Sequence, residues 1–204
     1  MARINLPRYN LRIEDMYTLH KTEGIIMRAQ DTGEADKIFT VFSRDFGKIT
    51  LHARGVRLAR SKLKGHLNIL SRVRLAFIAG QDILRLTDAE EGENYFHIMS
   101  PAALSAMGRA LRLVDRLVRG TERDEPLWRL LSEYLEKLKK TALPPPILET
   151  LFNARLLGVL GYVSTDDEHF EELLGGNNWA ETQYSSFQDK LEDLCRIGLA
   201  ASHL

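Results

Sequence analysis

The sequence predicts an α+β protein, in which a small N-terminal β-barrel is followed by an α-helical domain. Up to about residue 90, short runs of β-branched and aromatic residues alternate with turn signals, as they do in strands. Near residue 100 the apolar residues change to the three- and four-residue spacing of amphipathic helices. The length of 204 residues, with 44% hydrophobic and 27% charged residues, suits one large folded domain or two small ones.

Five strands are expected in the first part of the chain. They cover residues 22–29, 38–42, 48–53, 72–77 and 82–87, with turns at 30–34 and 45–47. In the third of them Ile49, Leu51 and Ala53 alternate with polar residues. One face of this strand should therefore be buried, and the other face, which is basic, should be exposed to solvent. Five strands in about 75 residues indicate a Greek-key barrel of the OB type.

Helices are expected from residue 100 onward. Ser100 and Pro101 are a typical N-cap and first helical residue, and the helix that they begin should end at Gly120. Further helices are expected over about 126–140, from the prolines at 144–146 to Gly161, and over about 181–201. We therefore divide the chain into an N-terminal arm (1–16), an OB-fold nucleic-acid-binding domain (17–95) and a helical domain with an acidic C-terminal region (96–204).

Several functional classes are excluded by the residues themselves. No apolar run reaches the roughly 18 uncharged residues of a spanning helix, and charges interrupt the first 20 residues, so we expect a cytoplasmic protein with no membrane contact. Cys195 is the single cysteine and cannot by itself form a structural zinc site. The motifs GxxxxGK[ST], GxGxxG, GxSxG and HExxH do not occur. We expect no catalytic residues, no cofactor and no metal.

The charge of the chain is strongly polarised, although the total is zero. Residues 1–80 carry 15 Lys and Arg against 7 Asp and Glu, which gives +8, and residues 81–204 carry 13 against 21, which gives −8. The segment 44–74 holds nine bases and one acid. We interpret this segment as a polyanion-binding site that contacts phosphates; the alternative is an ordinary solvated surface.

Other candidate residues have a functional and a structural interpretation. Phe39, Phe42, Phe46 and Phe77 could stack on bases, but aromatic residues of a small barrel more often form its core. His169 lies among acids that form either a metal site or, the favoured interpretation, a solvated linker; Cys195 is better explained as a small buried hydrophobe than as a nucleophile. Arg155, on an otherwise apolar helix, either extends outward to solvent or pairs with an internal acid such as Asp115 or Glu149; the alternative is that it holds the carboxylate of a partner peptide.

Several blocks of the sequence, taken in order, resemble the RecO family of bacterial recombination mediators. They are HKTEGII (20–26), GEADKI (33–38), VFSRDFGKI (41–49), ARGVR (53–57), SKLKGHL (61–67), FNARLL (152–157) and LGY (160–162). The resemblance covers roughly residues 17–165. It implies an OB fold followed by a helical domain, and a protein without enzymatic turnover.

The resemblance also implies partners. Members of this family bind single- and double-stranded DNA, anneal complementary strands, engage the acidic C-terminal tail of the single-strand-binding protein (SSB), and join RecR in helping to load RecA. The DNA contacts implied by matching positions are Lys37, Arg44, Lys48, Arg54, Arg57, Lys62 and Lys64, and the basic segment adds Arg60, Arg72 and Arg74. Arg155 matches a tail-binding position. The four-cysteine zinc motif of many relatives is missing here, so zinc binding is not expected.

Other functions remain open at this stage. An RNA-binding OB module would also need a basic barrel, and a protein adaptor could use that barrel to dock an acidic partner. An enzyme is the least favoured interpretation. The sequence predicts that changing Arg57, Lys62 and Lys64 together to Ala weakens DNA binding and flattens its salt dependence.

Overall fold

The computed structural model describes residues 18–80, 83–140 and 143–163, Trp179, and residues 189–193, 195–197, 199 and 200. The expected N-terminal arm and the acidic patch around His169 lie outside these residues. Two compact units are present: residues up to Ile98 with Val114–Glu125 form the barrel unit, and Met99–Leu113 with the residues from Pro126 onward form the helical unit. The α+β fold class is thereby confirmed.

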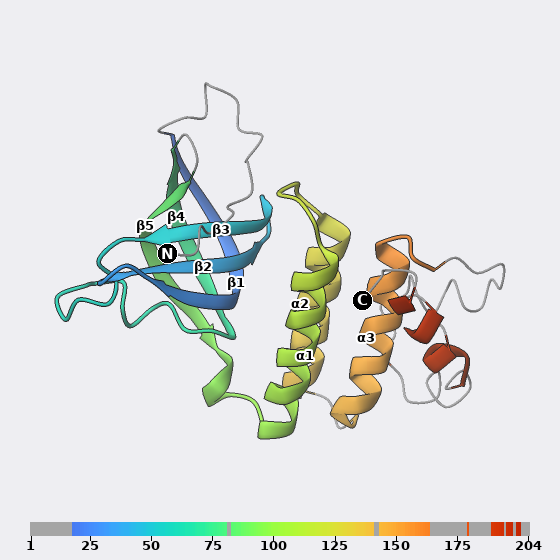
Figure 1. Ribbon diagram of the computed structural model, residues 1–204. Helices are drawn as coiled ribbons and strands as arrows, with labels where there is room; N and C mark the ends of the chain where they lie inside the picture. Colours follow the sequence, from blue (N-terminus) through green and yellow to red (C-terminus); the bar gives the residue numbers. More distant parts are fainter. Residues whose placement is uncertain are drawn as a thin grey trace. The chain divides into compact units, whose positions relative to one another are not determined.

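The barrel unit is built on a closed five-strand barrel (Figure 1). Its strands are β1 (Leu19–Thr32), β2 (Asp36–Ser43), β3 (Gly47–Ala53), β4 (Ser71–Ala79) and β5 (Leu84–Asn94), and a 3-10 turn, η2 (Tyr95–His97), follows. They close in the order β1-β2-β3-β5-β4, and the pairing of β3 with β5 is parallel. A closed barrel of five strands agrees with the expected OB fold.

All five strands are longer than the sequence pattern predicts, and β1 and β5 exceed it most. The polar residues 30–32 continue β1, because their backbone groups pair with β2 in a register that includes Asp31 with Lys37. Likewise β5 runs on from Thr87 to Asn94 and pairs with β4 throughout. A polar sequence does not end a strand when a neighbouring strand satisfies its backbone hydrogen bonds.

The barrel core consists of the alternating apolar residues. Ile49, Leu51 and Ala53 are buried as expected, and so are Phe39, Phe42 and Phe77. Phe46 is half-buried and packs edge-on against Phe77, with ring centroids 5.2 Å apart. The core interpretation of these aromatic residues is confirmed for Phe39, Phe42 and Phe77, which have no exposed face for a base.

The helices begin and end near the expected residues. They are α1 (Pro101–Leu117), α2 (Glu125–Lys140) and α3 (Pro145–Val159). Ser100 caps α1 by accepting a hydrogen bond from the Ala103 amide at 3.3 Å, and Gly161, with a φ of 74°, follows the end of α3. Of the expected last helix, residues 189–193, 195–197, 199 and 200 are helical, and the rest lies outside the described residues. Among the described helices, none is long and apolar enough to span a bilayer.

Candidate nucleic-acid interface

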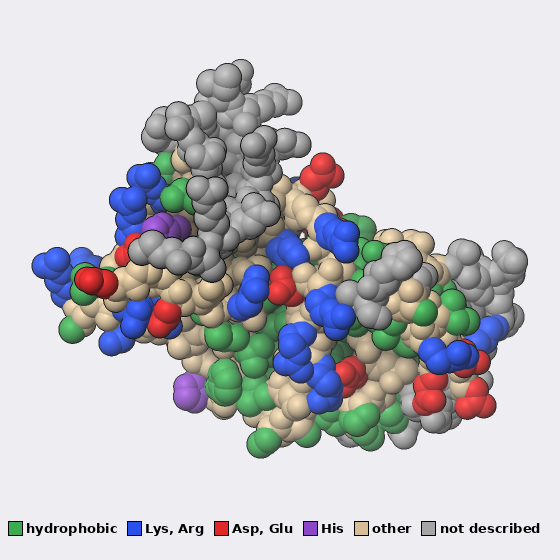
Figure 2. Space-filling model, in the orientation of Figure 1, with side chains coloured by type: hydrophobic (Ala, Val, Ile, Leu, Met, Phe, Trp, Pro, Cys, Tyr) green, Lys and Arg blue, Asp and Glu red, His purple; other side chains and the backbone are tan. Residues whose placement is uncertain are grey.

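Residues 54–65, which we call the basic loop, carry five of the ten predicted DNA-contact residues. The loop leaves β3 as a series of turns, closed by backbone bonds such as that from the Leu58 amide to the Gly55 carbonyl at 3.1 Å. Val56 is buried in the barrel core and Leu63 packs against it. These apolar residues fix the loop to the barrel, and the cations between them are left at the surface. Figure 2 shows Lys and Arg side chains at the left, where Figure 1 places this loop.

Asp36 fastens the first turn of the basic loop to β2. Its Oδ1 accepts a hydrogen bond from the Gly55 amide at 2.7 Å, and its Oδ2 lies 2.9 Å from His52 Nε2. Gly55 adopts a φ of 62°, which favours glycine, and the next bond runs from the Arg57 amide to the Ala35 carbonyl at 2.9 Å. The Gly55 amide, and after it His52, hold the pKa of Asp36 below its usual range.

We expect Asp36→Ala to cost about 1 kcal/mol of unfolding free energy and to loosen the start of the basic loop. Folding lowers the pKa of Asp36, so the ionised carboxylate stabilises the fold above the pKa of 3.8 that it has in the unfolded chain. This stabilisation is lost as the pH falls through the pKa of the folded state. The variant should therefore lose part of the acid sensitivity of the wild type. Urea unfolding between pH 3 and 7 and hydrogen exchange at Gly55 measure both effects.

Glu34, an exposed acid of the turn between β1 and β2, lies two residues before Asp36 and supplies the control as Glu34→Ala. Wild-type exchange at the Gly55 amide in Asp36→Ala would contradict the assigned anchoring role.

The predicted DNA-contact residues divide into a paired and a free set. The pairs are Lys37 with Asp31 (3.5 Å), Lys48 with Asp115 (3.4 Å), Arg57 with Asp31 (3.4 Å), Arg72 with Glu23 (3.6 Å) and Arg74 with Glu90 (2.6 Å). The free set consists of Arg44, Arg54, Arg60, Lys62 and Lys64, which are exposed and form no ion pair with the described residues. Apart from Arg54, whose charge also acts on the nearby Asp36, the free set presents uncompensated charge to a polyanion.

The paired cations differ in how easily they could be released. Arg74 and Glu90 are both about two-thirds exposed, and such surface pairs contribute little stability, so a phosphate can replace the carboxylate. The side chain of Lys48 is only 22% exposed, and its Nζ also donates to the Asp115 carbonyl at 2.6 Å. Lys48 therefore joins β3 to the end of α1 within the barrel unit, which is a structural role.

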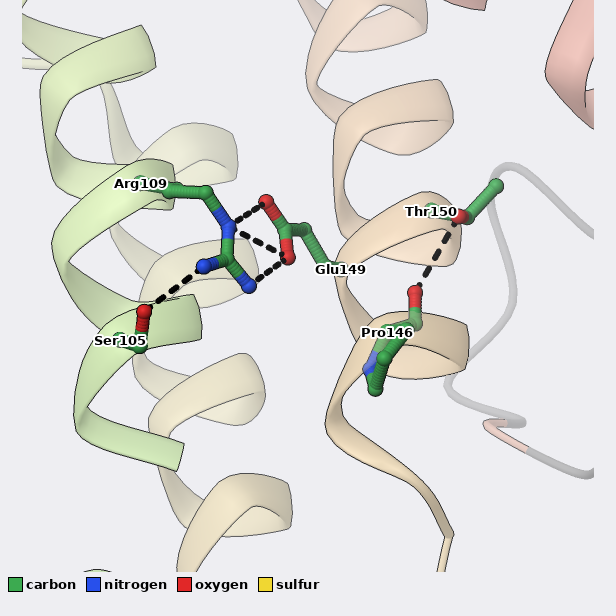
Figure 3. Close-up of polar contacts among 5 residues, drawn as sticks. All are labelled: Ser105, Arg109, Pro146, Glu149 and Thr150. Carbon is green, nitrogen blue, oxygen red and sulfur yellow. Dashed lines mark hydrogen bonds and ion pairs between the residues drawn. The ribbon is translucent and has the colours of Figure 1, made fainter. Parts of the chain in front are cut away.

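Further cations escaped the sequence analysis. Arg109, Arg112, Arg116, Arg119 and Arg123 follow a three- and four-residue spacing along α1 and beyond it. Arg109 forms a bidentate ion pair with Glu149 of α3 (Figure 3), and Arg123 pairs with Glu125. Arg112, Arg116 and Arg119 are exposed, and no acid among the described residues forms an ion pair with them. Their helical spacing could have identified them as one basic stripe, but the surrounding acids, which give 81–204 a net charge of −8, drew attention away from it.

Arg155 lies in the core of the helical unit. Its residue is 2% exposed, and its guanidinium carbon lies 4.4 Å from the ring centroid of Trp179. Burial lowers the pKa of Arg155 to about 10. The acids suggested from the sequence have other partners: Glu149 binds Arg109, and Asp115 binds Lys48. The internal acid that acts on the guanidinium is Glu133, whose charge opposes the lowering of the pKa, and the Trp179 ring adds an aromatic contact.

The described residues give little support for a cysteine nucleophile or a metal site. Burial raises the pKa of the Cys195 thiol to about 11, so the thiolate is scarce at neutral pH, and Sγ lies 3.8 Å from the Thr150 carbonyl. Cys195 is half-buried, so it is less enclosed than the buried hydrophobe that the sequence suggested. No cluster of three or more metal-binding side chains occurs among the described residues.

Comparison with known families decides the affiliation. The model of the recombination protein O N-terminal domain matches residues 16–95, and that of the C-terminal domain matches residues 100–196. The chain belongs to the RecO family. The resemblance carried by the sequence blocks is thereby confirmed, and the two RecO matches correspond to the strands β1–β5 and to the region that holds α1–α3.

Curated RecO relatives show the same affiliation. A protein named DNA repair protein RecO from Bifidobacterium longum subsp. infantis is 33% identical over 71% of this chain and 62% of its own length. Those from Acetivibrio thermocellus and Moorella thermoacetica are 30% and 31% identical over 70% of this chain, and over 57% and 53% of their own lengths. The chain thus spans somewhat more than half the length of these RecO relatives.

Proposed function

We propose that this chain acts in DNA repair and homologous recombination as a mediator that binds single- and double-stranded DNA and anneals complementary strands. The observation that carries the proposal is the free set of cations, most of them on a loop that apolar residues and Asp36 hold to a closed OB-type barrel. Membership of the RecO family, and the name DNA repair protein borne by the relatives, support it.

The mechanism is electrostatic. Cations of the free set neutralise phosphates and release condensed counterions, which makes binding favourable and dependent on salt. When phosphates of two strands are neutralised together, the repulsion that slows their pairing falls. Exposed pairs such as Arg74 with Glu90 add contacts after their carboxylate is exchanged for phosphate. None of these steps needs ATP, a cofactor or a metal, so we propose a mediator without turnover, located with the nucleoid in the cytoplasm.

Assembly with protein partners is part of the proposal. We infer that the helical unit binds the acidic tail of the single-strand-binding protein through Arg155, and that the chain works with RecR to assist RecA loading. Because Arg155 is buried beneath Trp179, a carboxylate can reach the guanidinium only if the indole ring moves aside. Tail binding is therefore proposed to be coupled to a displacement of Trp179.

We expect Arg155→Met to lower the free energy of unfolding by about 1–3 kcal/mol and to lose affinity for the tail peptide. The change removes the contact of the guanidinium with Trp179 and its attraction to Glu133, and the tail carboxylate loses its charged partner. Urea unfolding and fluorescence anisotropy with a labelled acidic tail peptide measure the two effects. Arg109→Met, which removes an exposed arginine bound to Glu149, is the matched control. Undiminished peptide binding in Arg155→Met would refute the role of Arg155.

The decisive experiment is annealing of complementary oligonucleotides coated with the cognate single-strand-binding protein, without ATP, at two salt concentrations. We expect acceleration that weakens with salt and disappears when the coating protein lacks its tail. Binding to naked DNA without acceleration on coated strands would refute the mediator role. Stronger binding to matched RNA oligonucleotides would favour an RNA-binding module, and binding to neither nucleic acid would favour a protein adaptor.

A further inference from the structure

A hollow of about 430 Å³ lies in the barrel unit beside the basic loop, and the proposed function does not yet use it. It is lined by Ala29 of β1, Lys37 of β2, Leu67, Asn68, Ile69, Asn94 and Phe96. Phe96 of η2 is 56% exposed and Ile69 is 42% exposed, although side chains of this kind are usually buried. An exposed aromatic ring at the edge of a hollow of this size is suited to a flat, partly apolar ligand.

Polar groups of the hollow are held in fixed positions by Glu91. This carboxylate accepts hydrogen bonds from the side-chain amides of Asn68 at 2.8 Å and Asn94 at 3.1 Å. Asn94 Oδ1 in turn accepts the Phe96 amide at 3.2 Å, which fixes the turn that carries the ring. The Asn68 amide oxygen forms no hydrogen bond with the described residues, so it can accept one from a ligand.

The hollow is connected to the basic loop through Asp31. This carboxylate lies 3.5 Å from Lys37 Nζ in the lining and 3.4 Å from Arg57 Nε in the loop. Leu67, also in the lining, is buried in the barrel core two residues after the loop ends. A ligand with an aromatic part in the hollow and a negatively charged chain along the loop would therefore satisfy both surfaces.

We propose that the hollow binds one unpaired nucleobase, stacked on Phe96, of a DNA strand whose phosphates run along the basic loop. This inference rests on the proposed function. Stacking of a base on an aromatic side chain tolerates any sequence, and the Asn68 oxygen adds one acceptor for a base amino group. A paired base is enclosed in its duplex and cannot enter, so the hollow favours single-stranded over double-stranded DNA.

The test compares Phe96→Ala with wild type on an oligonucleotide that carries the fluorescent base 2-aminopurine, whose emission falls on stacking. We expect affinity for the single strand to fall about tenfold and quenching to be lost, with duplex affinity and the salt slope unchanged. Ile98→Ala is the matched control, because Ile98 is 51% exposed but does not line the hollow. Phe96→Tyr should restore quenching, and Asn68→Ala should weaken single-strand binding in a chain with an intact η2.

The outcomes separate this inference from the proposed function. Wild-type single-strand affinity and quenching in Phe96→Ala, in a chain that binds DNA through the basic loop, would overturn the base site alone. An equal loss on single strands and duplex would also overturn it, because a base site does not act on duplex. If the wild-type chain binds neither form of DNA, the base site and the proposed function both fail.

Discussion

Changing Arg60, Lys62 and Lys64 together to Ala should lower DNA affinity by roughly ten- to a hundredfold at low salt. These residues are exposed, belong to the free set and lie within the basic loop. Each phosphate contact contributes about 0.9 to the slope of log affinity against log salt on duplex and about 0.7 on single strands. The slope should therefore fall by about two to three. Titrations by fluorescence anisotropy from 25 to 200 mM salt measure both quantities.

This variant replaces Arg57 of the sequence-based triple with Arg60. Arg57 and Lys37 both pair with Asp31, and loss of Arg57 would leave that carboxylate less neutralised and more repulsive to phosphates, which confuses a lost contact with a new repulsion. Arg60 has no such partner among the described residues. The loss of affinity in the revised triple can therefore be assigned to the removed contacts.

The matched control is the triple change of Arg123, Lys140 and Arg196 to Ala. It removes the same charge from exposed side chains, each of which pairs with an acid. Equal losses in the two triples would mean that affinity follows net charge and not the loop. Unchanged affinity and slope in the loop triple would place the site elsewhere, with Arg112, Arg116 and Arg119 as the next candidates.

The sequence predicts those parts of the fold that depend only on the local pattern of apolar and polar residues. In β3, burial alternates along a few consecutive residues, so Ile49, Leu51 and Ala53 identify both the strand and its core face. The ends of β1 and β5 depend on pairing with β2 and β4. The residues there are polar and carry no local strand signal, and only the partner strand makes the extension favourable.

For the site, the sequence predicts where Lys and Arg residues cluster but not which of them lack an ion-pair partner. Lys and Arg side chains normally reach the surface, so those of segment 44–74 were readily identified as surface charge. Their neutralisation depends on distant acids: Glu90 is 16 residues from Arg74, and Asp115 is 67 residues from Lys48. Arg155 shows the same limit, because its aromatic neighbour Trp179 comes from a distant part of the chain.

Gly47→Ala should destabilise the barrel unit more than any exposed charge change. Gly47 opens β3 with a φ of 57°, where a residue with a Cβ costs about 1–2 kcal/mol. A Cβ at this position would clash with the Glu122 carbonyl oxygen, so the backbone of one segment must move. Overpacking of this kind costs a further ~1–3 kcal/mol. Urea unfolding, with the midpoint and slope fitted separately, measures the sum.

Gly33→Ala separates the two contributions. Gly33 has a φ of 56°, close to that of Gly47, but no atom lies within 4 Å of the position of its Cβ. The control should therefore show the backbone cost alone, and the difference between the variants reports the packing of Glu122 against the turn. Equal losses would contradict that packing. Because Lys48 directly follows Gly47, a displaced turn should also weaken the Lys48–Asp115 ion pair, which joins β3 to the end of α1.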